Sequence, residues 1–90
     1  MPRWPSLHKY APLTAYLVAQ SDDRVTLTFV ELEAILGAAL PPSAWMRPWW
    51  GDTPAASAQG RAWLRAGWRV EQIDLQSTMP TVTFVRVQPS

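Results

Sequence analysis

The segment 45–68 combines tryptophan and arginine, two residue types that bind nucleic acids. Aromatic rings stack on bases, and arginine binds phosphates or the edge of guanine. Between residues 41 and 70, four arginines stand against one acid, Asp52, which gives a local charge of 4 − 1 = +3, while the whole chain carries only +1. Seven of the eight basic residues of the chain are arginine, the residue preferred for bidentate and stacking contacts. The candidate face comprises Trp45, Arg47, Trp49, Trp50, Arg61, Arg65, Trp68 and Arg69.

The same tryptophans also fit a structural role. Trp63 and Trp68 fall at positions that the apolar pattern assigns to the core. If Trp49 and Trp50 are extended, their side chains alternate, so we expect one of the two to be partly exposed. That pair then stacks on bases, closes a lid over the core, or forms a dimer interface, where tryptophan and arginine are also enriched.

Catalytic and metal-binding patterns are weak. The only histidine, His8, lies in a proline-flanked segment without an adjacent carboxylate. Glu31 and Glu33 are two positions apart on an expected helix, so their carboxyl groups diverge and do not form an acid–base pair. The chain has no cysteine and no metal-ligand spacing. We therefore expect a protein that is not an enzyme and holds neither a metal nor a cofactor.

Length and composition indicate one small domain. A chain of 90 residues with 48% hydrophobic residues can build one core. We expect an arm over residues 1–8, where Pro2 and Pro5 disfavour regular structure, and one domain over residues 9–88. The lack of cysteine favours the cytoplasm, and no apolar run reaches the ~18 residues needed to cross a membrane.

Apolar periodicity and capping residues predict the helices. Thr28 and Glu31 have the spacing of a capping box, and Gly37 supplies a stop. The later helix starts with Thr53 as its cap and Pro54 in its first turn. The predicted segments are 12–19, 29–36, a short turn at 44–47, and 53–66.

Alternating apolar residues predict strands at 24–29, 68–75 and 81–87, the last two joined as a hairpin. The expected fold is α+β, with three main helices, a short helical turn and a small antiparallel sheet in the order α-β-α-α-β-β. A winged helix has this order, and its recognition helix corresponds to 53–66, with Arg61 and Arg65 towards DNA. The link at 38–52 is longer than the three or four residues of a tight helix-turn-helix.

Six strings of residues carry a resemblance that spans nearly the whole chain. The strings are KYAPL at 9–13, LTFVELEAILG at 27–37, LPPSA at 40–44, WW at 49–50, AWLRAGWRV at 62–70 and VTFVR at 82–86. Together they resemble a small bacterial domain family of unknown function. The resemblance implies a bacterial protein that stands alone or is attached to nuclease-like domains, and this favours nucleic acid as the partner.

The resemblance also ranks individual residues. The polar residues that match the family pattern, Lys9, Ser43 and Arg86, are hard to explain as core residues, so they join the candidate site. The family pattern has asparagine where this chain has Asp52. Ionised aspartate only accepts hydrogen bonds, so the exchange weakens any contact that this side chain makes to phosphate or a base.

These observations predict a non-enzymatic domain that binds nucleic acid, most readily DNA. The alternative is a homodimer or a protein-interaction module with a tryptophan-rich interface. A small-ligand site would require Lys9, Ser43 and Arg86 to converge around a cavity. The candidate nucleic-acid-binding residues are Lys9, Ser43, Arg47, Trp49, Trp50, Arg61, Arg65, Arg69 and Arg86.

Overall fold

The computed structural model describes residues 9–51 and 58–87 of the chain. The bounds of the elements are α2 (Ala11–Val18), β1 (Arg24–Thr28), α3 (Phe29–Leu36), η1 (Pro42–Trp45), α4 (Pro48–Gly51), α5 (Ala58–Arg65), β2 (Trp68–Asp74) and β3 (Thr81–Arg86). This order confirms the expected α+β fold. The expected arm at 1–8 lies outside the described residues.

The ends of α3 are set by local chemistry. Thr28 Oγ1 accepts a hydrogen bond from Glu31 N at 3.0 Å, and Glu31 Oε1 accepts one from Thr28 N at 2.8 Å. These two bonds confirm the expected capping box. Gly37 ends the helix in the left-handed conformation with φ of 73°, which glycine adopts without a Cβ clash.

The sheet is antiparallel, and β3 lies between β1 and β2. On one face, Val82 pairs with Leu27 on one side and Ile73 on the other, and all three are buried. On the opposite face, the hydroxyl groups of Thr26 and Thr83 are hydrogen bonded at 2.9 Å. The period of two therefore separates an apolar inner face from a polar outer face.

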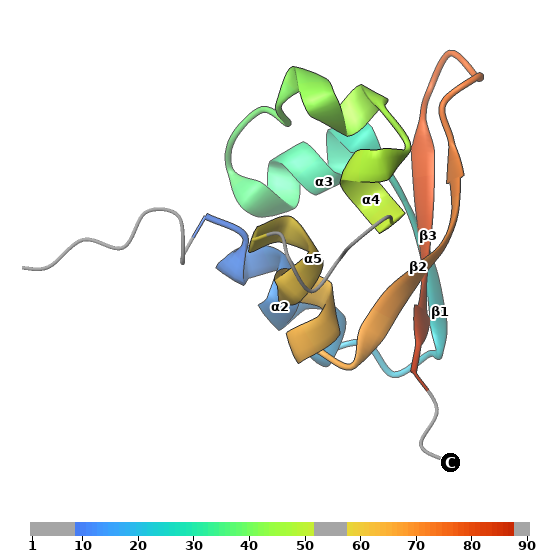
Figure 1. Ribbon diagram of the computed structural model, residues 1–90. Helices are drawn as coiled ribbons and strands as arrows, with labels where there is room; N and C mark the ends of the chain where they lie inside the picture. The colour runs from blue at the N-terminus through green and yellow to red at the C-terminus, as the bar shows by residue number, and fades with distance from the viewer. Residues whose placement is uncertain (1–8, 52–57, 88–90) are drawn as a thin grey trace, which may run out of the picture.

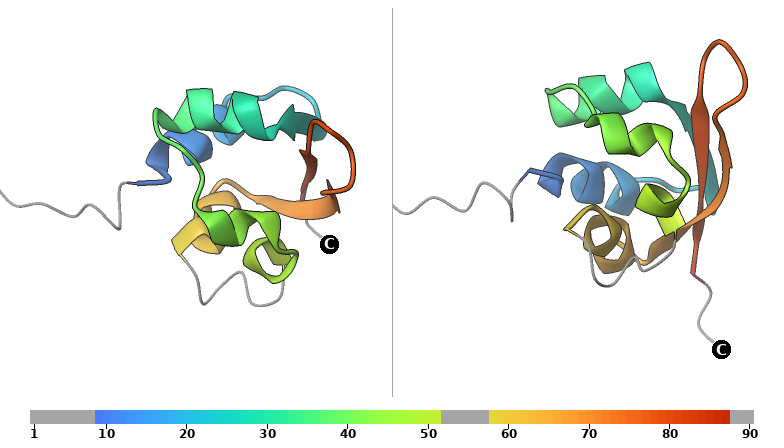
Figure 2. Two further views of the ribbon diagram at one scale, coloured as in Figure 1. Left: turned by 90° about the horizontal axis from the view of Figure 1, so that it is seen from above. Right: turned by 45° about the horizontal axis from the view of Figure 1, so that its top comes forward.

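The helices form a layer against the inner face of the sheet, and no described helix covers the outer face (Figure 1). Seen from above, α2 lies between α3 and α5 (Figure 2). Thr14 of α2 donates from its hydroxyl to Ala62 O of α5 at 2.8 Å. The hydrophobic core fills the space between the two layers, with Leu17, Leu32 and Phe84 fully enclosed.

The segment between α3 and α5 differs from the sequence-based expectation. The expected turn at 44–47 is replaced by η1, two residues earlier, and the expected turn or extended piece at Trp49 and Trp50 is the helical turn α4. The physical reason lies in Pro42 and Pro48, which begin these turns with φ already fixed near the helical value. Of the third main helix, the structure describes Ala58–Arg65; its expected cap, Thr53, lies outside the described residues.

Candidate nucleic-acid interface

Three tryptophans form the centre of the core. Trp50, Trp63 and Trp68 are each exposed by 2% or less, which confirms the core assignment of the latter two. The rings of Trp50 and Trp63 stack with their centroids 5.7 Å apart, and Trp50 Nε1 donates to Ala44 O at 2.7 Å. Trp50 was expected among the stacking residues, but its ring is enclosed by the core and presents no face to a base.

Two other described tryptophans reach the surface. Trp49 is half-buried, with its ring 6.0 Å from that of Tyr10. Trp45 is 52% exposed and lies edge-on against Phe29, with centroids 5.0 Å apart. The division of the adjacent pair into one buried and one partly exposed indole is confirmed, although the cause is a helix rather than a strand, because successive helical side chains lie roughly 100° apart.

The solvent side of α5 is basic. Arg61, Leu64 and Arg65 are exposed, while Ala62 and Trp63 between them are buried. The exposed residues have the spacing i, i+3 and i+4, which places them on one stripe of the helix. The eight residues of α5 include no acid. The arginines of the expected recognition helix therefore share one surface, with Leu64 between them.

Lys9 and Trp49 lie near the N-terminal end of α5. Gln59 Nε2 donates to Trp49 O at 3.1 Å, and the Trp49 ring lies 6.5 Å from the ring of Trp63 in α5. Lys9 Nζ lies 5.6 Å from the centroid of Tyr10, whose other neighbour is Trp49. Lys9 and the half-buried indole thus lie beside the start of the basic helix.

Arg69 belongs to a different surface. Arg69 is exposed on β2, where it pairs with Val85 of β3 on the outer face of the sheet. Arg24 pairs with the same Val85 from β1 and forms an ion pair with Glu71, with Nη2 and Oε1 2.8 Å apart. The outer sheet face and the stripe on α5 belong to opposite layers of the molecule.

Ser43 and Arg47 lie near the short turns. Ser43 is exposed in η1. Arg47 Nη1 donates to Ile73 O at 3.2 Å. This bond ties the connection between η1 and α4 to β2, so the Arg47 side chain has a structural contact as well as an exposed position.

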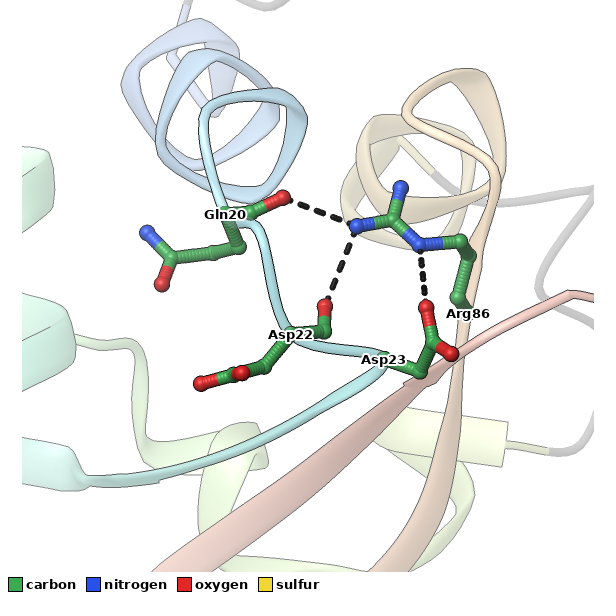
Figure 3. A network of polar contacts seen from close by, with 4 residues as sticks. All are labelled: Gln20, Asp22, Asp23 and Arg86. Carbon is green, nitrogen blue, oxygen red and sulfur yellow. Dashed lines mark hydrogen bonds and ion pairs between the residues drawn. The ribbon is translucent and has the colours of Figure 1, made fainter.

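Arg86 connects the end of β3 to the chain between α2 and β1 (Figure 3). Its Nη2 donates to Gln20 O at 2.8 Å and to Asp22 O at 3.0 Å, and its Nε pairs with Asp23 Oδ1 at 3.0 Å. The guanidinium carbon lies 4.7 Å from the centroid of the Trp68 ring. These contacts account for an arginine at this position without a ligand.

The three polar residues ranked by resemblance do not converge. Arg86 binds the chain just beyond the C-terminal end of α2, and Lys9 precedes its N-terminal end, which places them about 12 Å apart along an eight-residue helix. Ser43 belongs to η1. The arrangement lends no support to a small-ligand site made of these residues.

Other chemical features of the described residues are few. No cluster of three or more His, Cys, Asp or Glu side chains at 9–51 and 58–87 is arranged to hold a metal ion. Within the same ranges, no helix has both the length and the apolar character to cross a membrane. Burial raises the pKa of the Tyr10 phenol above its usual value of 10.0.

Sequence reasoning did not single out three exposed apolar residues. Val30, Met46 and Met79 are exposed by 65%, 62% and 57%. The sequence indicates the exposure of Val30, because this residue lies outside the apolar stripe of α3 that contains Phe29 and Leu32. The other two lie in segments without periodicity, where no pattern distinguishes inward from outward side chains.

Comparison with known proteins identifies the family. The family model described as a domain of unknown function, DUF7662, matches residues 10–87. The chain belongs to this family. No curated protein and no solved structure matches the chain.

Proposed function

We propose that this member of a family of unknown function binds nucleic acid through the solvent side of α5. The observation that carries the proposal is the stripe of Arg61, Leu64 and Arg65 on a helix without acids. The two arginines are four residues apart, so they lie about 6 Å apart along the helix axis. Both can contact one phosphate backbone, because guanidinium groups bind phosphate oxygens in a bidentate manner.

The neighbouring Lys9 and Trp49 extend this surface. Lys9 adds a third cation at the N-terminal end of the helix, close to Tyr10. Trp49 is half-buried, and the exposed part of an indole provides a platform for an unpaired base. The proposed interface therefore consists of three cations and one indole: Lys9, Trp49, Arg61 and Arg65.

The order and pairing of the elements also favour α5 as the helix that binds nucleic acid. A helix, a strand, two helices and a terminal hairpin, with β1 paired to the second strand of the hairpin, correspond to the arrangement of a winged helix. In that arrangement α5 corresponds to the recognition helix and the β2–β3 turn to the wing. This support is an analogy of fold. The link between α3 and α5 contains η1 and α4 instead of a tight turn, so we propose phosphate contacts rather than groove reading by a helix pair.

A binding titration tests the proposal. Labelled single-stranded and double-stranded DNA is titrated with the protein at several salt concentrations, and the fluorescence anisotropy is measured. Three phosphate contacts give a slope of log K against log salt of about −2 for single strands and about −3 for duplex. The double substitution Arg61→Gln and Arg65→Gln leaves one cation. The slope should then become shallower and reach about −1.

The outer sheet face offers a matched control. The double substitution Arg24→Gln and Arg69→Gln removes the same charge from the opposite layer, and the exposed ion pair that it breaks contributes little to stability. We expect this variant to bind DNA with the wild-type slope. If it loses binding while the α5 variant does not, the interface is on the sheet. If the wild-type protein does not bind either DNA at low salt, the proposed function is wrong.

A further inference from the structure

Four exposed apolar side chains gather near the start of α3. We call them the Trp45 patch: Val30, Trp45, Met46 and Met79, exposed by 65%, 52%, 62% and 57%. Val30 follows Phe29, whose ring lies 5.0 Å from that of Trp45. Phe29 N donates to Pro80 O at 3.0 Å, and Pro80 follows Met79. Three segments distant in sequence therefore bring apolar side chains to the surroundings of Phe29.

The Trp45 patch lies away from Arg61 and Arg65 of the proposed nucleic-acid interface but borders Trp49, because Trp49 N donates to Met46 O at 3.2 Å. In Figure 1, η1 and the turn between β2 and β3 lie at the upper end of the molecule, whereas α5 lies lower, beside α2. The right-hand view in Figure 2 shows the same separation. The Trp45 patch shares no residue with the proposed interface, so a partner on the Trp45 patch does not depend on the proposed function.

The composition of the Trp45 patch is that of a protein interface. The core encloses Trp50, Trp63 and Trp68 completely, yet leaves half of Trp45 in solvent. Clustered exposed apolar side chains mark interaction sites, and tryptophan, methionine and arginine are enriched at such sites. The arginine here is Arg47, which is exposed next to Met46.

The charges beside the patch indicate which partner fits. Glu31 is exposed next to Val30, and Arg47 is exposed next to Met46. Glu31 Oε1 accepts the bond from Thr28 N, which leaves the acceptor capacity of its second oxygen. Arg47 Nη1 donates to Ile73 O, and a guanidinium has four further donors. Residues next to the Trp45 patch in the chain thus carry one carboxylate and one guanidinium.

We propose that a second copy of this chain docks on the Trp45 patch and forms a two-fold symmetric dimer. A two-fold axis brings the same patch of both copies together. Trp45 of one copy then packs on the patch of the other, and each Arg47 faces the Glu31 of its neighbour. A partner whose surface carries charges of one sign would be repelled by either Glu31 or Arg47. In a second copy, Arg47 and Glu31 provide a charge opposite to each of the two.

Sedimentation equilibrium of the full chain from about 1 µM to about 1 mM tests this proposal, a range that includes the weak affinity of a small interface. We expect a concentration-dependent shift from monomer to dimer. Trp45→Ser should weaken association at least tenfold. Val18→Ser, at a residue exposed by 60% on α2, should leave it unchanged. A wild-type chain that stays monomeric throughout, or a Trp45→Ser variant that dimerises with the wild-type affinity, overturns the proposal.

A charge exchange tests the two-fold geometry itself. Arg47→Glu places two acids opposite each other at both contacts of a homodimer, and Glu31→Lys places two cations there. Each variant alone should therefore associate more weakly, while an equimolar mixture should dimerise, because both contacts in the mixed pair join opposite charges. Circular dichroism of each variant checks that α3 still folds without the Glu31 carboxylate. A mixture that associates no better than its components contradicts the two-fold arrangement.

Discussion

Arg86→Ala is expected to destabilise the domain by about 3 kcal/mol, as the sum of three kinds of contact. The side chain donates to Gln20 O and Asp22 O, pairs with Asp23 and stacks on Trp68. All four contacts tie the end of β3 to residues that are far away in the sequence. Their loss leaves the backbone bond from Arg86 N to Asp23 O, at 2.8 Å, to hold the chain between α2 and β1 to the end of β3.

The magnitude follows from the exposure of each partner. The Asp23 side chain is 70% exposed and that of Arg86 31%, so solvent limits their ion pair to less than about 1 kcal/mol. The two bonds to backbone carbonyls contribute about 1 kcal/mol each at this partial burial. The cation–π contact adds about 0.5–1 kcal/mol. The sum lies between about 2 and 4 kcal/mol.

Urea denaturation followed by circular dichroism measures this difference in the free energy of unfolding. Asp23→Asn removes only the exposed ion pair and should cost less than about 1 kcal/mol. Arg86→Lys keeps the charge but not the planar fork, so it should behave more like alanine than like wild type. If Arg86→Ala changes stability by less than about 0.5 kcal/mol, as an ordinary surface substitution does, the reasoning is refuted and a ligand-binding role for Arg86 gains support.

Two further predictions concern local features. Thr28→Ala removes the cap of α3 and should cost about 1 kcal/mol in the same assay, whereas Thr78→Ala in the exposed turn should cost almost nothing. Because burial raises the pKa of Tyr10, the unfolded chain releases the phenolic proton at lower pH than the folded domain. The contribution of Tyr10 to the free energy of unfolding should thus be constant below about pH 10 and fall above it. Tyr10→Phe should reduce that fall between about pH 9 and about pH 11, and an unchanged slope would contradict the assignment.

Features encoded by a few neighbouring residues could be predicted from the sequence. The capping box of Thr28 and Glu31, the stop at Gly37 and the hairpin of β2 and β3 are confirmed. Each depends on a fixed spacing within a few residues, so the pattern itself contains the physical cause. The core positions of Trp63 and Trp68 are confirmed for the same reason, because they follow the period of their own helix or strand.

Features that depend on distant partners could not be predicted. Trp50 is buried because its ring stacks on Trp63 and its N–H reaches Ala44 O, and the contact with Trp63 joins two different helices. The hydrogen-bond partners of the Arg86 side chain precede it by 63 to 66 residues, so nothing near it in the chain reveals them. Arg69 and Arg65 are close in sequence, yet the strand places Arg69 on the outer sheet face.

The position of β3 has a consequence for how the chain is made. The strand in the middle of the sheet is the last of the three to be synthesised, and its partner β1 is the first. Arg24 pairs with Val85 and Thr28 with Thr81, so β1 leaves the ribosome with no neighbour to pair with. Such long sequence separations slow folding, and an unpaired strand is prone to aggregation meanwhile. Translation that stops before residue 81 leaves β1 and β2 without the strand that joins them.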